Sequence, residues 1–333
     1  MAVPTGTFQA HSAIGNREDL EDMIWTISPT ETPFTSRVSK IKATAVFHEW
    51  QTDALDAAAA NAHIEGDDAV TSTATPTVRL RNYCQILQKT PRVSGTQRAV
   101  NTAGREDELS YQIMKRMKEL KRDLEFACIN NQESSAGTAG SPRKLAAVES
   151  WLATNKTSVG SGTAQTTPGY SGGTVASPTD STAAGTFIEQ NLKAMIQASY
   201  TAGGDPRVVM VNPALKARMS ANFTGLATRF RDVPSRQQAQ IIAGADVYVS
   251  DFGVHSIVPN RFMRGTDTTT STCLVLDMDY WALAQLRTLK QTELAKTGDS
   301  DRRQMLMEVT LVSRNQAASA KIADIDPSLT RAA

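Results

Sequence analysis

Residues 102–132 read TAGREDELSYQIMKRMKELKRDLEFACINNQ and form the strongest helical pattern in the chain. Acidic residues stand near the expected first turn, where they stabilise the helix dipole, and basic residues gather on the polar face. At 1.5 Å per residue this helix would be about 45 Å long, which predicts a spine for the rest of the fold. The apolar residues recur at spacings of three and four, which places them on one face; they are Leu109, Ile113, Met117, Leu120, Leu124 and Cys128.

Two strand-like stretches precede the spine helix, at 45–53 and 77–94. Apolar and polar side chains alternate in them, as in strands with one exposed face. The intervening segment 54–76 is rich in Ala, Asp and Thr, so the region predicts a long hairpin with a mobile tip. Because an isolated two-stranded ribbon is only marginally stable in water, the hairpin needs another surface to lie on.

Charge is divided unevenly over this half of the chain. Residues 43–78 contain six acidic residues and no Lys or Arg, whereas residues 79–122 contain eleven basic and four acidic residues. This division favours contact between copies, with the acidic ribbon of one on a basic surface of the next. A merely solvated hairpin and helix face is an equally open alternative. The basic helix face could instead meet nucleic acid, although no aromatic residues are interleaved there to stack on bases. The candidate interface residues are Trp50, Asp53, Glu65, Asp67, Asp68, Arg79, Arg81, Arg229 and Arg231.

The other segments complete a mixed fold. Residues 1–42 predict an irregular arm with a short helix at 17–27, and Pro29 and Pro33 stop any helix because the residue before proline avoids the helical conformation. Residues 157–186 contain 21 Ser, Thr, Gly or Pro among 30 and predict a flexible insertion. The remaining pattern predicts an α+β fold, with short helices at 144–154, 187–200 and 214–222 and strands at 208–211, 246–250, 254–258, 272–285 and 305–312.

Composition excludes several classes of protein. With 333 residues, 40% of them hydrophobic, and a net charge of +1, the chain is typical of a folded protein and not of a dedicated nucleic-acid binder. No apolar run approaches the about 20 residues of a membrane-spanning helix, and the N-terminus lacks a secretory signal. The three cysteines, Cys84, Cys128 and Cys273, are far apart, which argues against a disulfide framework and for a reducing compartment.

Catalytic signatures are absent from the sequence. It contains no P-loop, no G-x-G-x-x-G and no G-x-S-x-G. Asp277 and Asp279 follow an apolar strand and could hold Mg²⁺ or Mn²⁺, so a metal-dependent transferase is one hypothesis; a polar turn between two strands is the simpler one. We therefore assign no catalytic, cofactor or metal residue. The four histidines lack metal-ligand spacing and are expected in packing or surface roles; they are His11, His48, His63 and His255.

Five short blocks connect the chain to a known family. They are SPTETPF at 28–34, FHEWQTDAL at 47–55, LAKTGDS at 294–300, EVTLVSRN at 308–315 and ASAKI at 318–322. Together with the order of elements, they resemble the HK97-type capsid subunit of tailed phages, and most closely the SU10-like major head protein family. The blocks lie near both ends, so the resemblance covers most of the chain.

The resemblance implies an α+β, HK97-like capsid fold with a defined division of the chain. The expected parts are an N-terminal arm at 1–42, an extended loop with its base at 43–100, a peripheral domain at 101–186, an axial domain at 187–285 and a return to the peripheral domain at 286–333. The spine helix and the insertion 157–186 would belong to the peripheral domain.

The resemblance also implies a function. The chain would be a major capsid protein that forms pentamers and hexamers of an icosahedral shell around double-stranded DNA, without catalysis or cofactor. It would be assembled in the bacterial host cytoplasm and reside in the virion. Its partners would be copies of itself, a portal, a scaffold, decoration proteins and packaged DNA, with no membrane. Some relatives cross-link a loop lysine to a neighbour's asparagine; here no lysine occurs between residues 43 and 88, so we expect no cross-link. An encapsulin-like nanocompartment shell on the same fold is the alternative.

Overall fold

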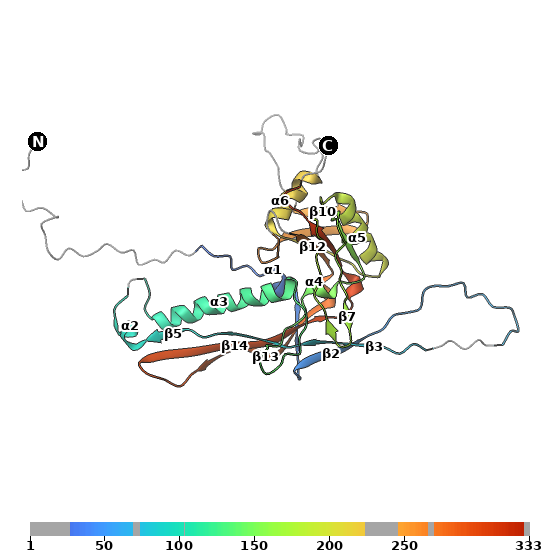
Figure 1. The fold of residues 1–333 in the computed structure, drawn as a ribbon. Helices are drawn as coiled ribbons and strands as arrows, with labels where there is room; N and C mark the ends of the chain where they lie inside the picture. Colours follow the sequence, from blue (N-terminus) through green and yellow to red (C-terminus); the bar gives the residue numbers. More distant parts are fainter. Residues whose placement is uncertain (1–26, 69–73, 103, 224–245, 266–269, 330–333) are drawn as a thin grey trace, which may run out of the picture.

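The computed structural model describes residues 27–68, 74–102, 104–223, 246–265 and 270–329. Figure 1 shows an elongated body formed by a long helix above a long β-hairpin, with a second lobe above one end of that body. A loop projects from the same end, pointing away from the body. Helices and strands are both abundant, in agreement with the predicted α+β class.

A five-stranded sheet and the helix α3 (Glu108–Ile129) make up the elongated body. The strands are ordered β1, β13, β14, β4, and β5 also pairs with β14. β1 runs parallel to β13, while the other pairs are antiparallel. The strands are β1 (Ser39–Lys42), β4 (Gln85–Lys89), β5 (Arg92–Ser94), β13 (Trp281–Glu293) and β14 (Ser300–Ser313), and the short helix α2 (Gly95–Ala99) follows β5.

The spine helix is confirmed, but it is shorter than 102–132. Asp107 is its N-cap, because its carboxylate accepts hydrogen bonds from the backbone N–H groups of Leu109 at 3.2 Å and Ser110 at 3.3 Å. The helix ends at Ile129 because the next residue has an extended backbone. Leu120 and Leu124 are buried in the main apolar core, as the apolar spacing predicts.

The predicted long hairpin is present. β2 (Phe47–Thr52) pairs antiparallel with β3 (Val78–Tyr83), and Phe47 lies opposite Tyr83. Beyond the paired part, residues 53–68 contain no helix or strand and every one of them is exposed. The base of the hairpin is therefore supported by its own chain, whereas its outer part is not.

The second lobe contains a six-stranded sheet ordered β10, β11, β9, β12, β15, β6. Asn212 caps α6 by accepting a hydrogen bond from the Leu215 backbone at 2.7 Å, with Pro213 at the first helical position, as predicted. The elements are β6 (Lys156–Ser158), α5 (Glu189–Thr201), β9 (Val208–Val211), α6 (Pro213–Asn222), β10 (Val247–Ser250), β11 (Gly253–Pro259), β12 (Ser271–Leu276) and β15 (Ala320–Ile325).

The chain changes sheets at different places from those expected. The predicted strand 272–285 is two strands, because a 3₁₀ turn at Met278–Tyr280 separates β12 from β13 and sends β13 into the other sheet. The expected boundary after residue 285 therefore falls inside β13. A second 3₁₀ turn, Gln316–Ala318, precedes β15, which returns to the six-stranded sheet beside β12. The C-terminal segment thus contributes to both lobes.

The prediction of a flexible insertion at 157–186 is wrong. The segment includes part of β6 and the strands β7 (Tyr170–Ser171) and β8 (Thr174–Val175), and it packs beside the short helix α4 (Val148–Trp151). Val175 is fully buried, and the Tyr170 ring stacks on Trp151 at 5.9 Å between ring centroids. The composition of the segment predicted flexibility because it does not reveal the contacts that order the segment, which come from residues far along the chain.

Those contacts form a buried polar cluster. The fully buried Asp324 carboxylate accepts hydrogen bonds from the backbone N–H groups of Gln165 at 3.0 Å and Ser181 at 2.8 Å. Arg264 pairs with both Glu149 and Asp180. The buried Lys321 ammonium donates to the Thr167 hydroxyl at 2.6 Å and the Glu149 carbonyl at 2.9 Å, and its burial lowers the pKa of Lys321 to about 7.

The end of the arm is held by the body of its own chain. The predicted helix at 17–27 lies outside the described residues except for its last residue. Pro33, expected only to end a helix, begins α1 (Pro33–Arg37), since proline suits the first helical position. The Phe34 ring is fully buried, 6.4 Å from Trp281 between ring centroids. The buried Glu125 carboxylate accepts from the backbone N–H groups of Phe34 and Thr35, both at 2.8 Å.

Candidate subunit interface

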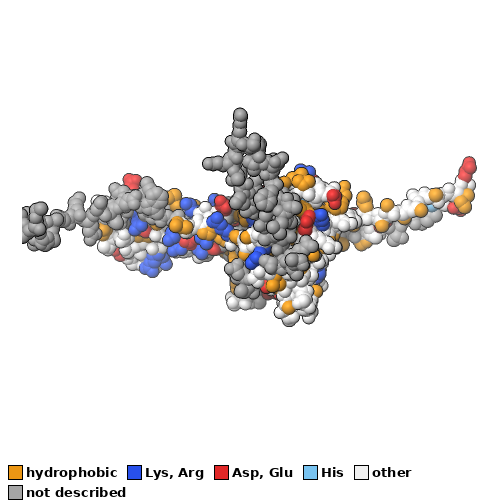
Figure 2. Space-filling view, turned by 90° about the horizontal axis from the view of Figure 1, so that it is seen from above, with side chains coloured by type: hydrophobic (Ala, Val, Ile, Leu, Met, Phe, Trp, Pro, Cys, Tyr) orange, Lys and Arg blue, Asp and Glu red, His pale blue; other side chains and the backbone are white. Residues whose placement is uncertain are grey.

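The predicted acidic residues lie on the unsupported part of the hairpin. Asp53, Glu65, Asp67 and Asp68 are all exposed, and no ion pair joins them to any described residue. Figure 2 shows acidic side chains at the far end of the projecting loop. Apolar side chains are exposed on the same segment, since Leu55 is 99% and Ile64 is 80% exposed. We call residues 53–68 the acidic limb.

Three other predicted interface residues are engaged within the chain. Trp50 packs against Trp151, with ring centroids 5.4 Å apart. The Arg81 guanidinium donates to the Gly173 carbonyl at 2.9 Å and lies over the rings of two aromatic neighbours on the same hairpin. Arg79 lies 3.6 Å from Glu49 on the paired strand, although its side chain is 68% exposed. The structure brings Trp50 and Arg81 to the base of the hairpin, apart from the acidic limb. Arg229 and Arg231 lie outside the described residues.

The exposed face of α3 is basic. Lys115, Lys118 and Lys121 are exposed and form no ion pair with the described part of the chain. Arg122 lies over the Phe262 ring at 5.4 Å. With Ser28 and Thr30 of the arm, Lys115, Lys118 and Arg122 line a hollow of about 460 Å³. We call Lys115, Lys118 and Lys121 the spine lysines.

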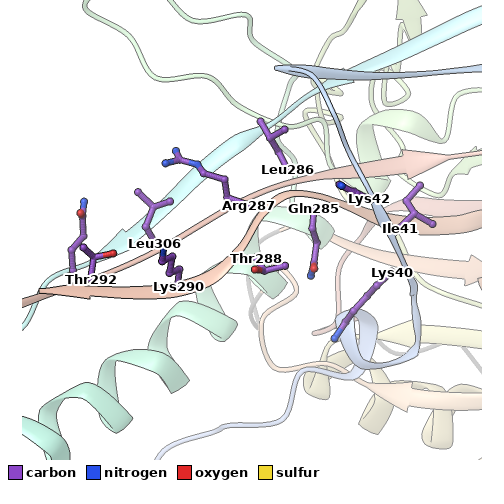
Figure 3. A pocket seen from close by; sticks show the side chains of 11 residues that line it. Lys40, Ile41, Lys42, Gln285, Leu286, Arg287, Thr288, Lys290, Thr292 and Leu306 are labelled. Atoms are coloured by element: carbon purple, nitrogen blue, oxygen red, sulfur yellow. The ribbon is translucent and has the colours of Figure 1, made fainter.

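A second basic surface was missed by the sequence analysis. It is a groove of about 760 Å³ lined by parts of β1, β13 and β14 (Figure 3). Lys40, Lys42 and Lys290 lie on it, exposed and without an ion pair to any described residue. Arg287 also lines the groove but pairs with Glu308 at 2.8 Å. Because parallel pairing places Lys42 opposite Gln285, residues 243 positions apart meet here, and no local pattern could have revealed it.

The groove coincides with an open strand edge. β1 pairs with β13 only from Ala282 to Gln285, opposite Ser39 to Lys42. Past Gln285, the remainder of β13 pairs with β14 on one side, and no described strand pairs with it on the other. Backbone N–H and C=O groups on such an edge are free to pair with an incoming extended chain.

Of the two aspartates considered for metal binding, Asp277 accepts hydrogen bonds from the backbone and Asp279 has an exposed side chain. The Asp277 carboxylate accepts from the backbone N–H groups of Asp205 at 3.0 Å and Asp279 at 3.2 Å. This geometry is that of a capped polar turn joining β12 to β13. Within the described ranges, no three His, Cys, Asp or Glu side chains lie close enough together to hold a metal ion.

Histidines and cysteines have packing or surface positions. His255 is buried, with its ring nitrogens 2.6 Å from the Pro206 carbonyl and 2.7 Å from the Ser250 hydroxyl. The His48 ring stacks on Trp50, and partial burial lowers the pKa of His48. His63 is exposed, and His11 lies outside the described residues. The three cysteines are buried and free, and burial raises the pKa of Cys84 to about 11.

None of the described helices combines the length and hydropathy that crossing a membrane requires.

Comparison with known proteins identifies this arrangement. Residues 3–326 match the family model described as SU10 major capsid protein. The chain is 31% identical over 350 residues to the major capsid protein of Escherichia phage Phieco32, covering 96% of this chain and 97% of that one. Its fold is similar to the capsid of Cyanophage A-1(L), with a TM-score of 0.67 at 11% identity over 96% and 98% of the two chains. An encapsulin from Synechococcus elongatus is also similar, with a TM-score of 0.54 at 10% identity over 96% and 95%.

Proposed function

The chain belongs to the SU10 major capsid protein family, and from that premise we propose that its copies assemble as pentamers and hexamers into an icosahedral shell around double-stranded DNA. The fold is the HK97-type capsid fold, and the protein is a component of the virion capsid. In this assembly the lobe with the five-stranded sheet and α3 is the peripheral domain, and the lobe with the six-stranded sheet is the axial domain. We place assembly in the cytoplasm of the bacterial host.

The acidic limb is the observation that carries the proposal. It extends from the body without secondary structure and with every residue exposed. A segment with exposed apolar side chains and no support from its own chain gains a defined position only by contact with another molecule. The interface residues are then Asp53, Glu65, Asp67 and Asp68. The contact is heterologous, since the limb meets a different surface on the neighbour.

The experiment is assembly of the purified chain, followed by size-exclusion chromatography and negative-stain microscopy. Wild type is expected to form closed shells. The triple variant with Asp53→Lys, Asp67→Lys and Asp68→Lys should remain folded as a subunit but give a lower yield of shells. High salt should also lower the yield of wild-type shells, because exposed ion pairs are screened beyond about 8–10 Å. Hydrogen exchange should show greater protection of residues 54–68 in shells than in subunits. Equal protection in both states would contradict the intersubunit role.

Packaged DNA is the partner we propose for the spine lysines. Lys115, Lys118 and Lys121 supply charge without stacking aromatics, which suits sequence-independent contact with phosphates. Changing all three to Gln should weaken binding of DNA fragments by subunits and flatten its salt dependence. A salt dependence equal to wild type would remove this assignment. Portal, scaffold and decoration proteins are the other partners we propose.

A nanocompartment shell is the second candidate, favoured by the similarity to the encapsulin. That similarity has a lower TM-score than the Cyanophage A-1(L) capsid, and the relative at 31% identity is a phage capsid protein. Protein cargo enclosed by shells in cells free of phage would favour the nanocompartment. We also propose that the protein has no catalytic activity and, in the absence of a lysine in the extended loop, no covalent cross-link. Calorimetry with Mn²⁺ and a nucleotide sugar should give no heat of binding.

A further inference from the structure

The segment 157–186 contacts both lobes of the subunit, and we call it the strap. Its middle part, with β7 and β8, lies at the base of the β2–β3 hairpin (Figure 1). There the Gly173 carbonyl accepts a hydrogen bond from the Arg81 guanidinium at 2.9 Å. The Val175 N–H group donates to the Ser134 hydroxyl at 2.6 Å. The middle of the strap is therefore fixed to the hairpin base.

The two outer parts of the strap lie on β15 of the six-stranded sheet. The Asp324 carboxylate accepts from the backbone N–H groups of Gln165 and Ser181, one on each side of β7 and β8. The Gly185 N–H group donates to the Asp324 carbonyl at 2.8 Å. The strap thus joins the hairpin base to the six-stranded sheet, and Asp324 holds it at the sheet.

Lys321 lies beneath the strap on the same strand. Its side chain is fully buried and donates to the Thr167 hydroxyl of the strap and to the Glu149 carbonyl of α4. The nearby carboxylates are committed to Arg264, whose guanidinium donates to Glu149 and to Asp180, both at 2.7 Å. Lys321 forms no ion pair with any described residue. A charged ammonium is therefore costly in this place, because it is buried without contact to a carboxylate.

The charges around Lys321 come from several elements. They are Glu149 on α4, Asp180 on the strap, Arg264 after β11, Lys156 on β6 and Asp324 on β15 itself. β12 carries no charged residue, and α5 packs on the opposite face of β15, in the apolar core that contains Ile322. Burial is the main cause that lowers the pKa of Lys321 to about 7, and the neighbouring cations lower it further while the carboxylates oppose them.

We propose that the strap is a proton-sensitive latch between the hairpin base and the six-stranded sheet, closed on β15 while Lys321 is neutral and released more often when Lys321 is protonated. Release exposes Lys321 to water, where the ammonium is stable, so opening takes up a proton. The middle of the strap stays in place, because a guanidinium, a hydroxyl and backbone groups keep their charge in this pH range. Proton uptake therefore changes how firmly the hairpin base is joined to the other lobe.

Hydrogen exchange of unassembled subunits tests the latch, with protection factors corrected for the intrinsic exchange rate at each pH. Protection of the Gln165, Ser181 and Gly185 N–H groups should rise about tenfold from pH 8 to pH 9 and level off below about pH 6, since opening takes up one proton only above the pKa of the closed state. Protection of the Val175 N–H group should not follow this dependence, which distinguishes release of the strap from unfolding of the whole chain.

Variants at Lys321 remove the proton-binding group. Lys321→Met should make the protection of the three N–H groups independent of pH between 7 and 9. Lys321→Gln is the second variant should the first fail to fold, because its amide keeps a donor for Thr167 and does not titrate. Lys193→Met is the matched control, since Lys193 is exposed on α5, and it should retain the wild-type dependence on pH.

Carbon NMR of subunits with labelled lysine gives a direct measurement on the wild-type chain. One lysine should titrate near pH 7, and its signal should be missing from the Lys321 variants. Absence of such a lysine, an unchanged pH dependence in the Lys321 variants, or an equal dependence at Val175 would overturn the inference. Shell formation enters none of these measurements, so their outcome leaves the proposed function unchanged.

Discussion

Glu125 is expected to hold the arm in place through an unusual cap. It lies on α3, is fully buried, and accepts hydrogen bonds from the backbone N–H groups of Phe34 and Thr35 at the start of α1. The same carboxylate accepts from the Asn260 side chain at 2.6 Å. One side chain therefore joins the arm, the spine helix and the segment that follows β11.

Glu125→Gln changes this site without changing its shape. Glutamine keeps one oxygen and replaces the other with NH₂, so a donor at the start of α1 loses its acceptor and faces another donor. A hydrogen bond to a charged group is worth about 1.5–3 kcal/mol, and removing a buried charge offsets part of that loss. We expect a loss of about 2 kcal/mol in the free energy of unfolding. Glu125→Ala should cost more, because it leaves three donors without an acceptor.

The measurement is equilibrium unfolding of unassembled subunits in urea, followed by the fluorescence of the four tryptophans, one of which, Trp281, lies beside Phe34. Trypsin cleavage after the exposed Arg37 should also become faster in Glu125→Gln. Glu133→Gln is the matched control, since Glu133 is exposed and surface changes usually stay within about 0.5 kcal/mol. Equal stability of Glu125→Gln, Glu133→Gln and wild type would refute the role of this cap.

The remaining predictions concern the core, the polar cluster and the turn before β13. Leu120→Ala should cost about 2–5 kcal/mol in thermal unfolding, whereas Met114→Ala, on the same helix but 61% exposed, should cost little. Because the pKa of Lys321 is lowered from 10.5 to about 7, the unfolded chain binds more protons between these values. Stability should therefore rise as pH increases above about 7, and Lys321→Met should abolish that rise in melting temperature. Asp277→Ala with Asp279→Ala should cost about 1–2 kcal/mol through the lost cap and leave the metal content measured by elemental analysis unchanged; a stoichiometric metal lost in this variant would contradict our assignment.

Short-range patterns predicted the elements that depend on nearby residues. The spine helix follows from apolar spacing within one or two turns, and α6 follows from Asn212 and Pro213 at its start. The strand Val208–Val211 has the predicted bounds, because a short apolar run between polar turns is typical of a buried strand and the turns fix where it begins and ends. The hairpin and the acidic limb were also visible in the sequence, since strand alternation and charge are properties of consecutive residues.

Tertiary structure decided the features that join distant residues. Glu125 lies 91 positions from Phe34, and Asp324 lies 159 positions from Gln165, so neither contact leaves a local pattern. The segment 157–186 is ordered because the distant Asp324 carboxylate and Lys321 supply hydrogen bonds that its own composition lacks. The groove exists because β1 pairs in parallel with β13 and stops at Lys42, leaving the rest of that strand edge open. Hydrogen-bonding partners and exposed edges are set by which strands meet, and that depends on the packing of the whole chain.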